Sequence, residues 1–319
     1  MNIIIEIYIV IAILAILLFL FRRYYPRKTH MQNANVVITG GSSGVGLAVA
    51  QECLDRGAHT VTLIARNKEG LDKAIQSLNY NKSQQIVFGY SADVSNWESL
   101  QSAFNNIKES VKTIDYLFAN AGFSKPGLFQ DTNGDDFQRQ ISVDYLGAAY
   151  TSRLALPMMK KGSHITYSGS VCSIFTFTGY SAYGPAKYAV KALAETLRNE
   201  LKSSHINIHM GILSTVDTPG LKRENEVKPE VCSAIEGTAH VFQPPYIAKE
   251  LLKGIDRNDY YITMEFLSWI MAELGFGICP TGNIFMQLLF APFIPLIRFG
   301  ALIYVDVLAR NPLPKPKSD

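Results

Sequence analysis

The chain alternates short runs of β-branched or apolar residues with longer stretches in which apolar residues recur at helical spacing. The short runs lie at residues 36–39, 61–65, 86–90, 116–119, 165–168 and 206–210. Strands that alternate with helix-length segments predict βαβ units, and therefore an α/β fold whose doubly wound parallel sheet carries helices on both faces. In such a fold, ligands bind beyond the carboxyl ends of the strands.

The segment at residues 3–21 is apolar almost throughout, with Glu6 as its only charge. At about 1.5 Å per residue, a helix there spans roughly 28 Å, close to the thickness of the bilayer hydrocarbon. Arg22, Arg23, Arg27 and Lys28 follow the run, whereas a secretory signal has its basic residues in front. The pattern predicts an uncleaved transmembrane anchor with the globular part in the cytosol. The alternative is a buried core helix.

The last 60 or so residues are again strongly apolar, at 266–271, 284–296 and 299–305. Proline and charged residues, Arg298 among them, interrupt these runs, so they favour re-entrant or interfacial membrane segments over clean spans. A core hairpin or an oligomer interface is the alternative. We therefore expect an anchor at 1–28, a catalytic domain at 29–262 with a loop-rich lid at about 215–246, and a membrane-associated region with a basic tail at 263–319.

Composition narrows the function classes. Of the 319 residues, 48% are hydrophobic and 18% charged, and the net charge of +3 comes without a long basic run, which disfavours a nucleic-acid partner. The four cysteines lie far apart, so the sequence predicts neither a disulfide framework nor a zinc site. His205 and His209 lack a clustered third ligand, and we expect no metal.

A glycine-rich turn joins the first predicted strand to a helical pattern. It contains Gly40, Ser42, Ser43, Gly44 and Gly46. Glycine lets the backbone approach a pyrophosphate closely, and the helix N-terminus that follows offers free N–H groups and positive dipole charge. The placement between strand and helix predicts a dinucleotide site.

The end of the second strand selects the kind of dinucleotide. An acidic residue there would bind the 2′-hydroxyl of NAD, but the chain has Arg66 instead. A guanidinium pairs well with a 2′-phosphate, so we expect NADP(H). The alternative is a solvated surface arginine.

The spacing of the glycines resembles that of the short-chain dehydrogenase/reductase family, and further motifs of that family follow in order. Tyr183 and Lys187 match its Y-x-x-x-K pair, although Tyr24 and Lys28 share that spacing without a serine partner. The resemblance implies a Rossmann-type fold, and it adds to the cofactor-binding residues Asp93, Val94, Asn120, Tyr183, Lys187 and Thr218.

The catalytic residues that the resemblance implies are Ser170, Tyr183 and Lys187. Reducing a ketone with a hydride creates oxyanion character, which needs a hydrogen-bond donor and then a proton. Ser170 can donate, Tyr183 can give the proton, and the ammonium one helical turn away favours the phenolate. The resemblance also implies that Lys187 holds the nicotinamide ribose.

Asp144 stands where the family has a catalytic Asn. Asn donates and accepts hydrogen bonds, whereas an ionised Asp only accepts. If the position serves through its backbone carbonyl, Asp suffices; if the amide donor matters, the proton relay is impaired. Its charge would also keep Lys187 protonated.

Within the family, the N-terminal anchor, the lid and the apolar C-terminal region resemble the 3-ketodihydrosphingosine reductase branch. That resemblance implies reduction of a membrane-borne aminoketone with NADPH at the cytosolic face of the endoplasmic reticulum. Lys315 and Lys317 match the spacing of a retrieval signal for that membrane, and acids to test against the substrate amine are Asp144, Glu230 and Glu236. Alternatives are a membrane-anchored reductase of a steroid, retinoid or 3-ketoacyl chain, and a catalytically weak scaffold. The family resemblance also implies that the chain forms a homo-oligomer.

Overall fold

The computed structural model describes residues 31–237, 239–274 and 284–297, with single residues at 10, 13, 14, 17, 299, 300 and 303. Its centre is a sheet of seven parallel strands in the order β3-β2-β1-β4-β5-β6-β7. The strands are β1 (Asn35–Thr39), β2 (Thr60–Ala65), β3 (Ile86–Ser91), β4 (Ile114–Ala119), β5 (Met159–Ser168), β6 (Asn207–Ile212) and β7 (Tyr261–Thr263).

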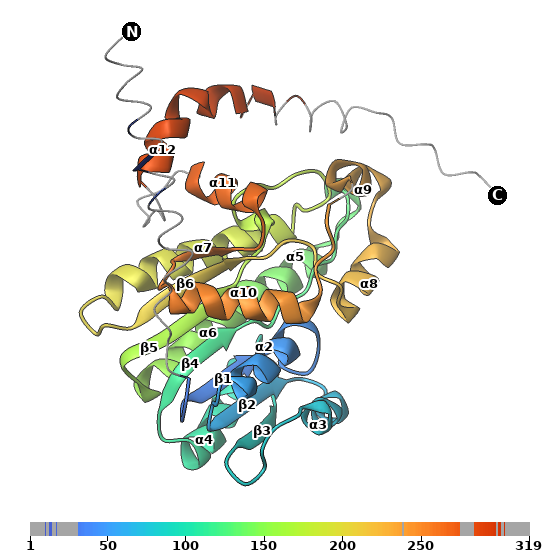
Figure 1. The fold of residues 1–319 in the computed structure, drawn as a ribbon. Coiled ribbons are helices and arrows are strands. Elements are labelled where there is room, and N and C mark those ends of the chain that lie inside the picture. Colours follow the sequence, from blue (N-terminus) through green and yellow to red (C-terminus); the bar gives the residue numbers. More distant parts are fainter. Residues whose placement is uncertain are drawn as a thin grey trace, which may run out of the picture.

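Helices connect the strands and cover both faces of the sheet (Figure 1). The α-helices are α2 (Gly44–Asp55), α3 (Lys68–Ser77), α4 (Trp97–Ser110), α5 (Gly134–Ile141), α6 (Gly147–Ala155), α7 (Tyr183–Glu200), α8 (Pro219–Val227), α9 (Glu230–Glu236), α10 (Pro244–Asp256), α11 (Phe266–Leu274) and α12 (Ile284–Phe290). The segment η2 (Ser142–Leu146) between α5 and α6 is a π-helix. Short 3₁₀ helices are η1 (Phe129–Asp131), η3 (Leu156–Met158), η4 (Val171–Ser173) and η5 (Ala291–Phe293).

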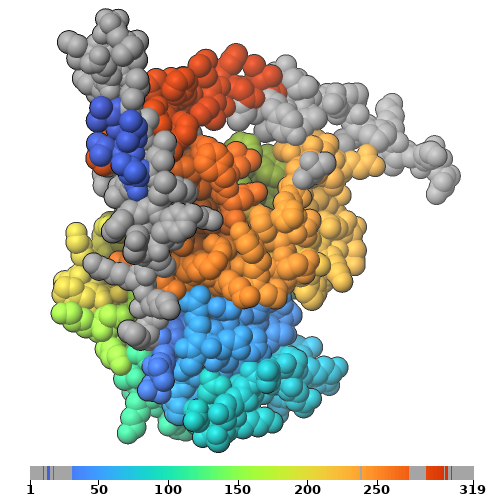
Figure 2. Space-filling model, in the orientation of Figure 1, coloured from blue at the N-terminus to red at the C-terminus, as the bar shows by residue number. Residues whose placement is uncertain are grey.

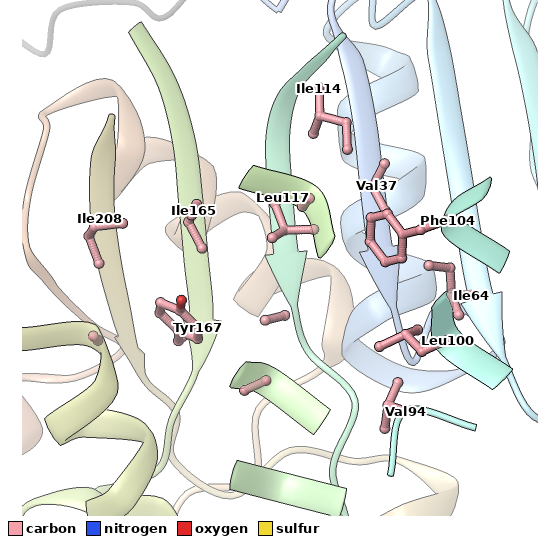
Figure 3. Packing of buried hydrophobic residues seen from close by; sticks show 14 of the residues in the cluster. Val37, Ile64, Val94, Leu100, Phe104, Ile114, Leu117, Ile165, Tyr167 and Ile208 are labelled. Atoms are coloured by element: carbon pink, nitrogen blue, oxygen red, sulfur yellow. The ribbon is translucent and has the colours of Figure 1, made fainter. Parts of the chain in front are cut away.

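Successive residues of each central strand point to opposite faces, which produces two cores. On one face Val37 packs with Leu100 and Phe104 of α4 and with residues of α6 and α7 (Figure 3). On the other face Val36 and Ile38 pack with α2, α3 and α10. The alternation explains why nearly continuous apolar runs form these strands, because both of their faces are buried.

The predicted parallel sheet is confirmed, with strand limits that differ from the sequence-based ones by a few residues. Sequence reasoning missed β7, which has only three residues and lies at the edge of the sheet. The lid at 215–246 was predicted to be loop-rich, but it contains α8 and α9. Pro219 and Pro229 explain the difference, because each stands at the start of a helix. A backbone N–H group at that position has no partner within the helix, so a proline there costs no hydrogen bond.

The two terminal regions are described only in part. The predicted anchor falls outside the described residues except at positions 10, 13, 14 and 17, which are helical and exposed. At the other end, α11 and α12 follow β7 and lie beyond the sheet in Figure 1, and the red atoms at the top of Figure 2 belong to the segment that contains α12. No helix in the described part of the chain is long and apolar enough to cross a membrane.

Candidate active site

The order of the strands reverses between β1 and β4, and the carboxyl ends of these strands carry the glycine-rich turn and Asn120. Gly40 and Gly44 have φ angles of +68° and +57°, which favour glycine. A Cβ atom on Gly46 would lie 2.3 Å from the carbonyl oxygen of Gly40. The turn therefore folds back tightly onto the first turn of α2, with no room for a side chain at Gly46.

The N-terminus of α2 has no side chain that satisfies its N–H groups. Ser43 is the N-cap residue, but its hydroxyl makes no capping hydrogen bond, and the first turn contains no acidic residue. An Asn or Thr side chain caps the N-terminus of α3, α4, α5 and α8, whereas α7, α9 and α10 also lack a side-chain cap. The donors at the start of α2 are thus left for an anion.

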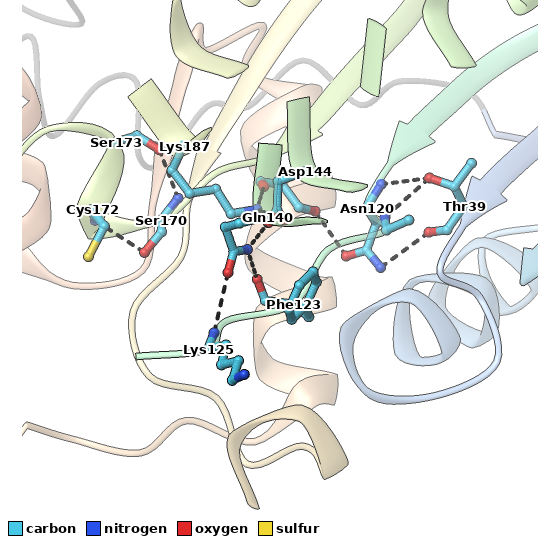
Figure 4. Close-up of polar contacts among 12 residues, drawn as sticks. Thr39, Asn120, Phe123, Lys125, Gln140, Asp144, Ser170, Cys172, Ser173 and Lys187 are labelled. Atoms are coloured by element: carbon cyan, nitrogen blue, oxygen red, sulfur yellow. Dashed lines mark hydrogen bonds and ion pairs between the residues drawn. The ribbon is translucent and has the colours of Figure 1, made fainter. Parts of the chain in front are cut away.

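Asn120 ties three strand ends together beneath this turn (Figure 4). Its Nδ2 atom donates to the carbonyls of Thr39 at 3.3 Å and of Gly40 at 3.5 Å, and its Oδ1 accepts from the Ser168 hydroxyl at 2.9 Å. Asn120 was predicted to contact the cofactor. In the structure its side chain holds the turn from β1 against the ends of β4 and β5.

Arg66 and Asp93 lie at the carboxyl ends of β2 and β3. Their charged atoms are 4.0 Å apart, and the Arg66 side chain is 58% exposed. Asp93 accepts hydrogen bonds from the backbone and hydroxyl of Ser95, which fixes one of its two carboxylate oxygens. Val94 was predicted as a cofactor contact, but its side chain is buried against Gly147 of α6.

Thr218 was the remaining predicted cofactor contact, on the lid side. Its hydroxyl accepts a hydrogen bond from the backbone of Leu221 at 3.1 Å and thereby caps α8. A Cβ atom on Gly44 would lie 2.9 Å from the Thr218 methyl group. The start of the lid therefore lies directly on the glycine-rich turn.

Ser170 follows β5 and is the N-cap residue of η4. Its Oγ atom accepts from the Cys172 backbone at 3.1 Å, while the Ser173 hydroxyl accepts from the Ser170 backbone. Because the capping bond uses an acceptor site of the hydroxyl, the proton of Ser170 is left to donate. Hydrogen bonding with Ser170 acts to lower the pKa of Tyr183.

Tyr183 begins α7, and Lys187 stands one turn further on the same face. The Lys187 ammonium lies 5.5 Å from the centre of the Tyr183 ring and donates to the carbonyl of Ser168 at 3.1 Å. Lys187 is buried, and such a charge needs a partner. Its partner is Asp144, whose carboxylate lies 3.1 Å from the ammonium.

The π-helical segment η2 aims Asp144 at this lysine. Asp144 is 1% exposed, and Gln140 of α5 donates hydrogen bonds both to its carboxylate and to the carbonyl of Phe123. A π-turn re-aims side chains within a helical run, and such turns are frequent at functional sites. Burial raises the pKa of Asp144, while Lys187 and Gln140 act in the opposite direction.

Gly122 leaves room for this pair. A Cβ atom there would lie 2.3 Å from the Asp144 carboxylate and 3.2 Å from the Lys187 ammonium. Gly122 is thus required by the Asp144 and Lys187 side chains that meet beside it.

The pKa of Tyr183 differs from the sequence-based expectation. Burial raises it well above its ordinary value, and the neighbouring Cys172 and Asp144 raise it further, whereas the bond with Ser170 lowers it. Sequence reasoning expected Lys187 to favour the phenolate, but the net effect of the surroundings is to raise this pKa, with burial as the largest cause. Tyr183 is therefore held protonated at neutral pH.

The acids proposed for the substrate amine occupy different environments. Glu236 accepts from the Tyr180 hydroxyl at 2.5 Å and pairs with Lys228 at 2.7 Å. Glu230 is exposed in the first turn of α9. Asp144 is committed to Lys187 as described above.

Sequence reasoning missed Gln140, Tyr180 and Cys172 as parts of the site. Gln140 stands four residues before Asp144, a spacing that places two side chains on one face of a helix. That spacing was the available signal for Gln140. Nothing in the sequence pointed to the contact of Tyr180 with Glu224 and Glu236, which lie more than 40 residues away.

Comparisons with known proteins agree with this geometry. Residues 34–229 match the short chain dehydrogenase family. A 3-ketodihydrosphingosine reductase of Dictyostelium discoideum is 30% identical over 93% of this chain and 94% of its own, and a 3-dehydrosphinganine reductase of Danio rerio is 31% identical over 88% and 86%.

Solved structures share the fold. Levodione reductase has a TM-score of 0.66 at 22% identity and covers 76% of this chain and 98% of its own. A short chain dehydrogenase from Burkholderia cenocepacia in complex with NADP has a TM-score of 0.62 at 18% identity, with 74% and 98% covered. The sheet, the glycine-rich turn and the match over residues 34–229 place this chain in the short-chain dehydrogenase family.

Proposed function

We propose that this protein reduces 3-ketodihydrosphingosine to dihydrosphingosine with NADPH. The single observation that carries the proposal is the convergence of Ser170, Tyr183 and the Lys187–Asp144 pair at the carboxyl edge of the sheet. The names of relatives that match this chain over most of its length support the choice of substrate.

The residues present fit a nicotinamide dinucleotide. The turn at Gly40–Gly46 is closed to any Cβ atom at Gly46, and the N–H groups at the start of α2 have no side-chain cap. Gly44 and Gly46 would thus face the pyrophosphate, and Arg66 the 2′-phosphate of the adenosine ribose, where a guanidinium can bind two oxygens. The bound cofactor supplies a hydride to the carbonyl carbon.

The protein's own groups manage the oxygen of the ketone. Ser170 keeps a hydroxyl proton with which to bind that oxygen, and Tyr183 gives the proton that the forming alkoxide needs. A tyrosine whose pKa is raised enters the reaction as an acid, which suits reduction. Lys187 pairs with Asp144, and in this proposal its ammonium holds the nicotinamide ribose and faces the Tyr183 ring.

We propose that the ketone reaches the site from a membrane of the endoplasmic reticulum, with the catalytic domain in the cytosol. The support is the apolar surface of α11, which starts where β7 ends at the catalytic edge of the sheet; Phe266 and Leu267 are 65% and 64% exposed. The Ser214 hydroxyl, at the entrance to the lid, donates to Glu265 at 2.6 Å, directly before α11. Lys315 and Lys317 lie outside the described residues.

The test is NADPH oxidation by the purified full-length chain in detergent. The substrates are 3-ketodihydrosphingosine, a steroid ketone and a 3-ketoacyl ester, each also assayed with NADH. We expect turnover of the aminoketone alone, and turnover of only the other ketones would overturn the substrate. Tyr183→Phe removes the proton donor and should abolish turnover while NADPH still binds.

The same assay tests Arg66. Arg66→Ala should raise the KM for NADPH about tenfold and leave the KM for NADH unchanged, because only the 2′-phosphate distinguishes the two cofactors. Arg56→Ala is the matched control, since Arg56 pairs with Glu52 and Asp256, away from the cofactor turn. Equal effects of Arg66→Ala on both cofactors would remove Arg66 from the site.

A further inference from the structure

The lid is an excursion of the chain that leaves and returns at one point. The backbone of Phe242 pairs with that of Thr215 and Asp217, with both hydrogen bonds 2.9 Å long. Between these ends lie α8 and α9. Because the chain enters and leaves the lid at this pairing, the position of α8 and α9 depends on their contacts with the segment beneath them.

Underneath, α9 packs on the segment that leads into the catalytic helix. Val231, Cys232 and Ile235 form a small buried cluster with Cys172 and Tyr180, and Tyr183 packs against it. The Cys232 thiol also donates to the carbonyl of Thr178 at 3.2 Å. The lid therefore lies directly on the segment that carries Tyr183.

Tyr180 makes the polar link between lid and catalytic helix. Its hydroxyl lies 2.7 Å from a carboxylate oxygen of Glu224 on α8 and 2.5 Å from one of Glu236 on α9. Lys228, between the two helices, pairs with both acids at 3.0 and 2.7 Å. The lysine side chain is only 4% exposed, so water screens these contacts weakly. We call Tyr180, Glu224, Lys228 and Glu236 the lid latch.

The other end of Tyr180 belongs to the start of α7. Its carbonyl accepts a hydrogen bond from the backbone of Gly184, in the first turn of that helix, at 2.8 Å. Its ring lies 5.8 Å from the ring of Tyr183. Movement of the Tyr180 hydroxyl with the lid would thus act on the ring that carries the catalytic proton.

We propose that Tyr180 is a positioning residue that couples docking of the lid helices to the placement of the Tyr183 hydroxyl. The inference rests on the proposed function, in which Tyr183 is the acid. Packing alone needs no hydroxyl at this position, because a phenylalanine ring would fill the same space. The hydroxyl with its two carboxylates is what joins both lid helices to a single side chain.

The first experiment compares Tyr180→Phe, Glu236→Gln and the double variant in steady-state kinetics. Each single change should lower kcat about tenfold without changing the Kd of NADPH, because Tyr180→Phe removes the hydrogen bond and Glu236→Gln removes the charge that strengthens it. The double variant should be no worse than the single ones, since both act through one contact. Tyr261→Phe is the matched control: it removes a Tyr–Glu bond of 3.2 Å to Glu195, away from the latch.

A pH profile separates positioning from a purely structural role. The charged and titratable groups around Tyr183 are Lys187 on its own helix, Asp144 of η2, Cys172 of η4, and Glu224 of α8. The Glu224 carboxylate raises the pKa of Tyr183. Glu224→Gln should therefore move the alkaline limb of the kcat profile to lower pH, whereas Glu250→Gln, which removes a half-buried acid that pairs with Lys253 on α10, should leave the limb in place.

Limited trypsin digestion tests the latch without any substrate. Lys222 and Arg223 are exposed on α8, and an undocked lid offers them to the protease more readily. Tyr180→Phe should speed cleavage there several-fold, and Tyr261→Phe should not. If no ketone is turned over, the proposed function fails, but the rate of trypsin cleavage still tests whether Tyr180 holds the lid helices in place. Wild-type kcat in both single variants overturns the inference, as does a wild-type cleavage rate in Tyr180→Phe.

Discussion

At the scale of single residues, one substitution reorganises the catalytic group. Asp144 stands where the family resemblance implies an Asn, and its carboxylate pairs with Lys187. The lysine charge is then shared between two neighbours, and burial leaves Tyr183 protonated. The arrangement favours proton donation over proton removal, which is the direction that a reductase needs.

Asp144→Asn tests this account. The variant leaves the buried Lys187 without its counter-charge, so we expect the free energy of unfolding to fall by roughly 3 kcal/mol. Loss of the negative charge should also lower the pKa of Tyr183 and move the alkaline limb of the kcat profile to lower pH. Denaturant unfolding and the pH profile measure the two effects.

The control for that variant is Asp136→Asn, which breaks the exposed ion pair of Asp136 with Lys125. It should cost less than about 1 kcal/mol and leave the pH profile unchanged. Equal losses of stability in the two variants would show that burial of the Asp144–Lys187 pair is not what matters.

At the scale of elements, a pair of histidines joins the last strands of the sheet. His164 of β5 lies 2.9 Å from His209 of β6, and the other ring nitrogen of His209 lies 2.6 Å from the carbonyl of Asp259. A carbonyl only accepts, so His209 donates to it and accepts from His164. Burial, reinforced at His164 by its histidine neighbour, lowers the pKa values from 6.5 to about 3 for His164 and about 4 for His209.

The pair predicts a pH dependence of stability. Between pH 6.5 and about 4 the unfolded chain binds protons that the folded chain refuses, so stability is complete above pH 6.5 and falls as the pH is lowered. At pH 5 each histidine should cost roughly 2 kcal/mol. Urea unfolding of the wild type and of His164→Phe should show the smaller loss between pH 7 and 5 in the variant. Parallel pH dependences in the two proteins would contradict the assignment.

At the scale of the whole molecule, the apolar face of α11 stands at the edge of the sheet where the active site opens. The Ser214–Glu265 bond lies between the base of the lid and the start of α11. If the ketone comes from a membrane, as proposed, the apolar face of α11 would serve both membrane contact and substrate access, because it starts at the same edge of the sheet as the site.

Phe266→Ser combined with Leu267→Ser tests this placement. The double variant should raise the KM for 3-ketodihydrosphingosine in vesicles about tenfold and leave the KM for a short-chain, water-soluble analogue unchanged. Ile86→Ser is the control, because Ile86 is an exposed apolar residue at the amino edge of the sheet. A KM that rises equally for both ketones would assign the two residues to catalysis or folding.

The sequence by itself determined the parallel sheet and the glycine-rich turn, and its resemblance to the short-chain dehydrogenase family singled out Ser170, Tyr183 and Lys187. The sheet and the turn follow from local patterns, namely two-sided burial of short strands and glycine spacing. Such features involve residues close together in the chain, so the sequence spacing of these residues nearly determines how they are placed in space.

Only the tertiary structure decided which charges meet. The pairing of Asp144 with Lys187, the return of Glu224 and Glu236 to Tyr180, and the two helices of the lid each join segments far apart in the sequence. Burial then sets the charge state, as the raised pKa of Tyr183 shows. Desolvation and distance act through the folded surroundings of a group, and the order of residues along the chain specifies neither.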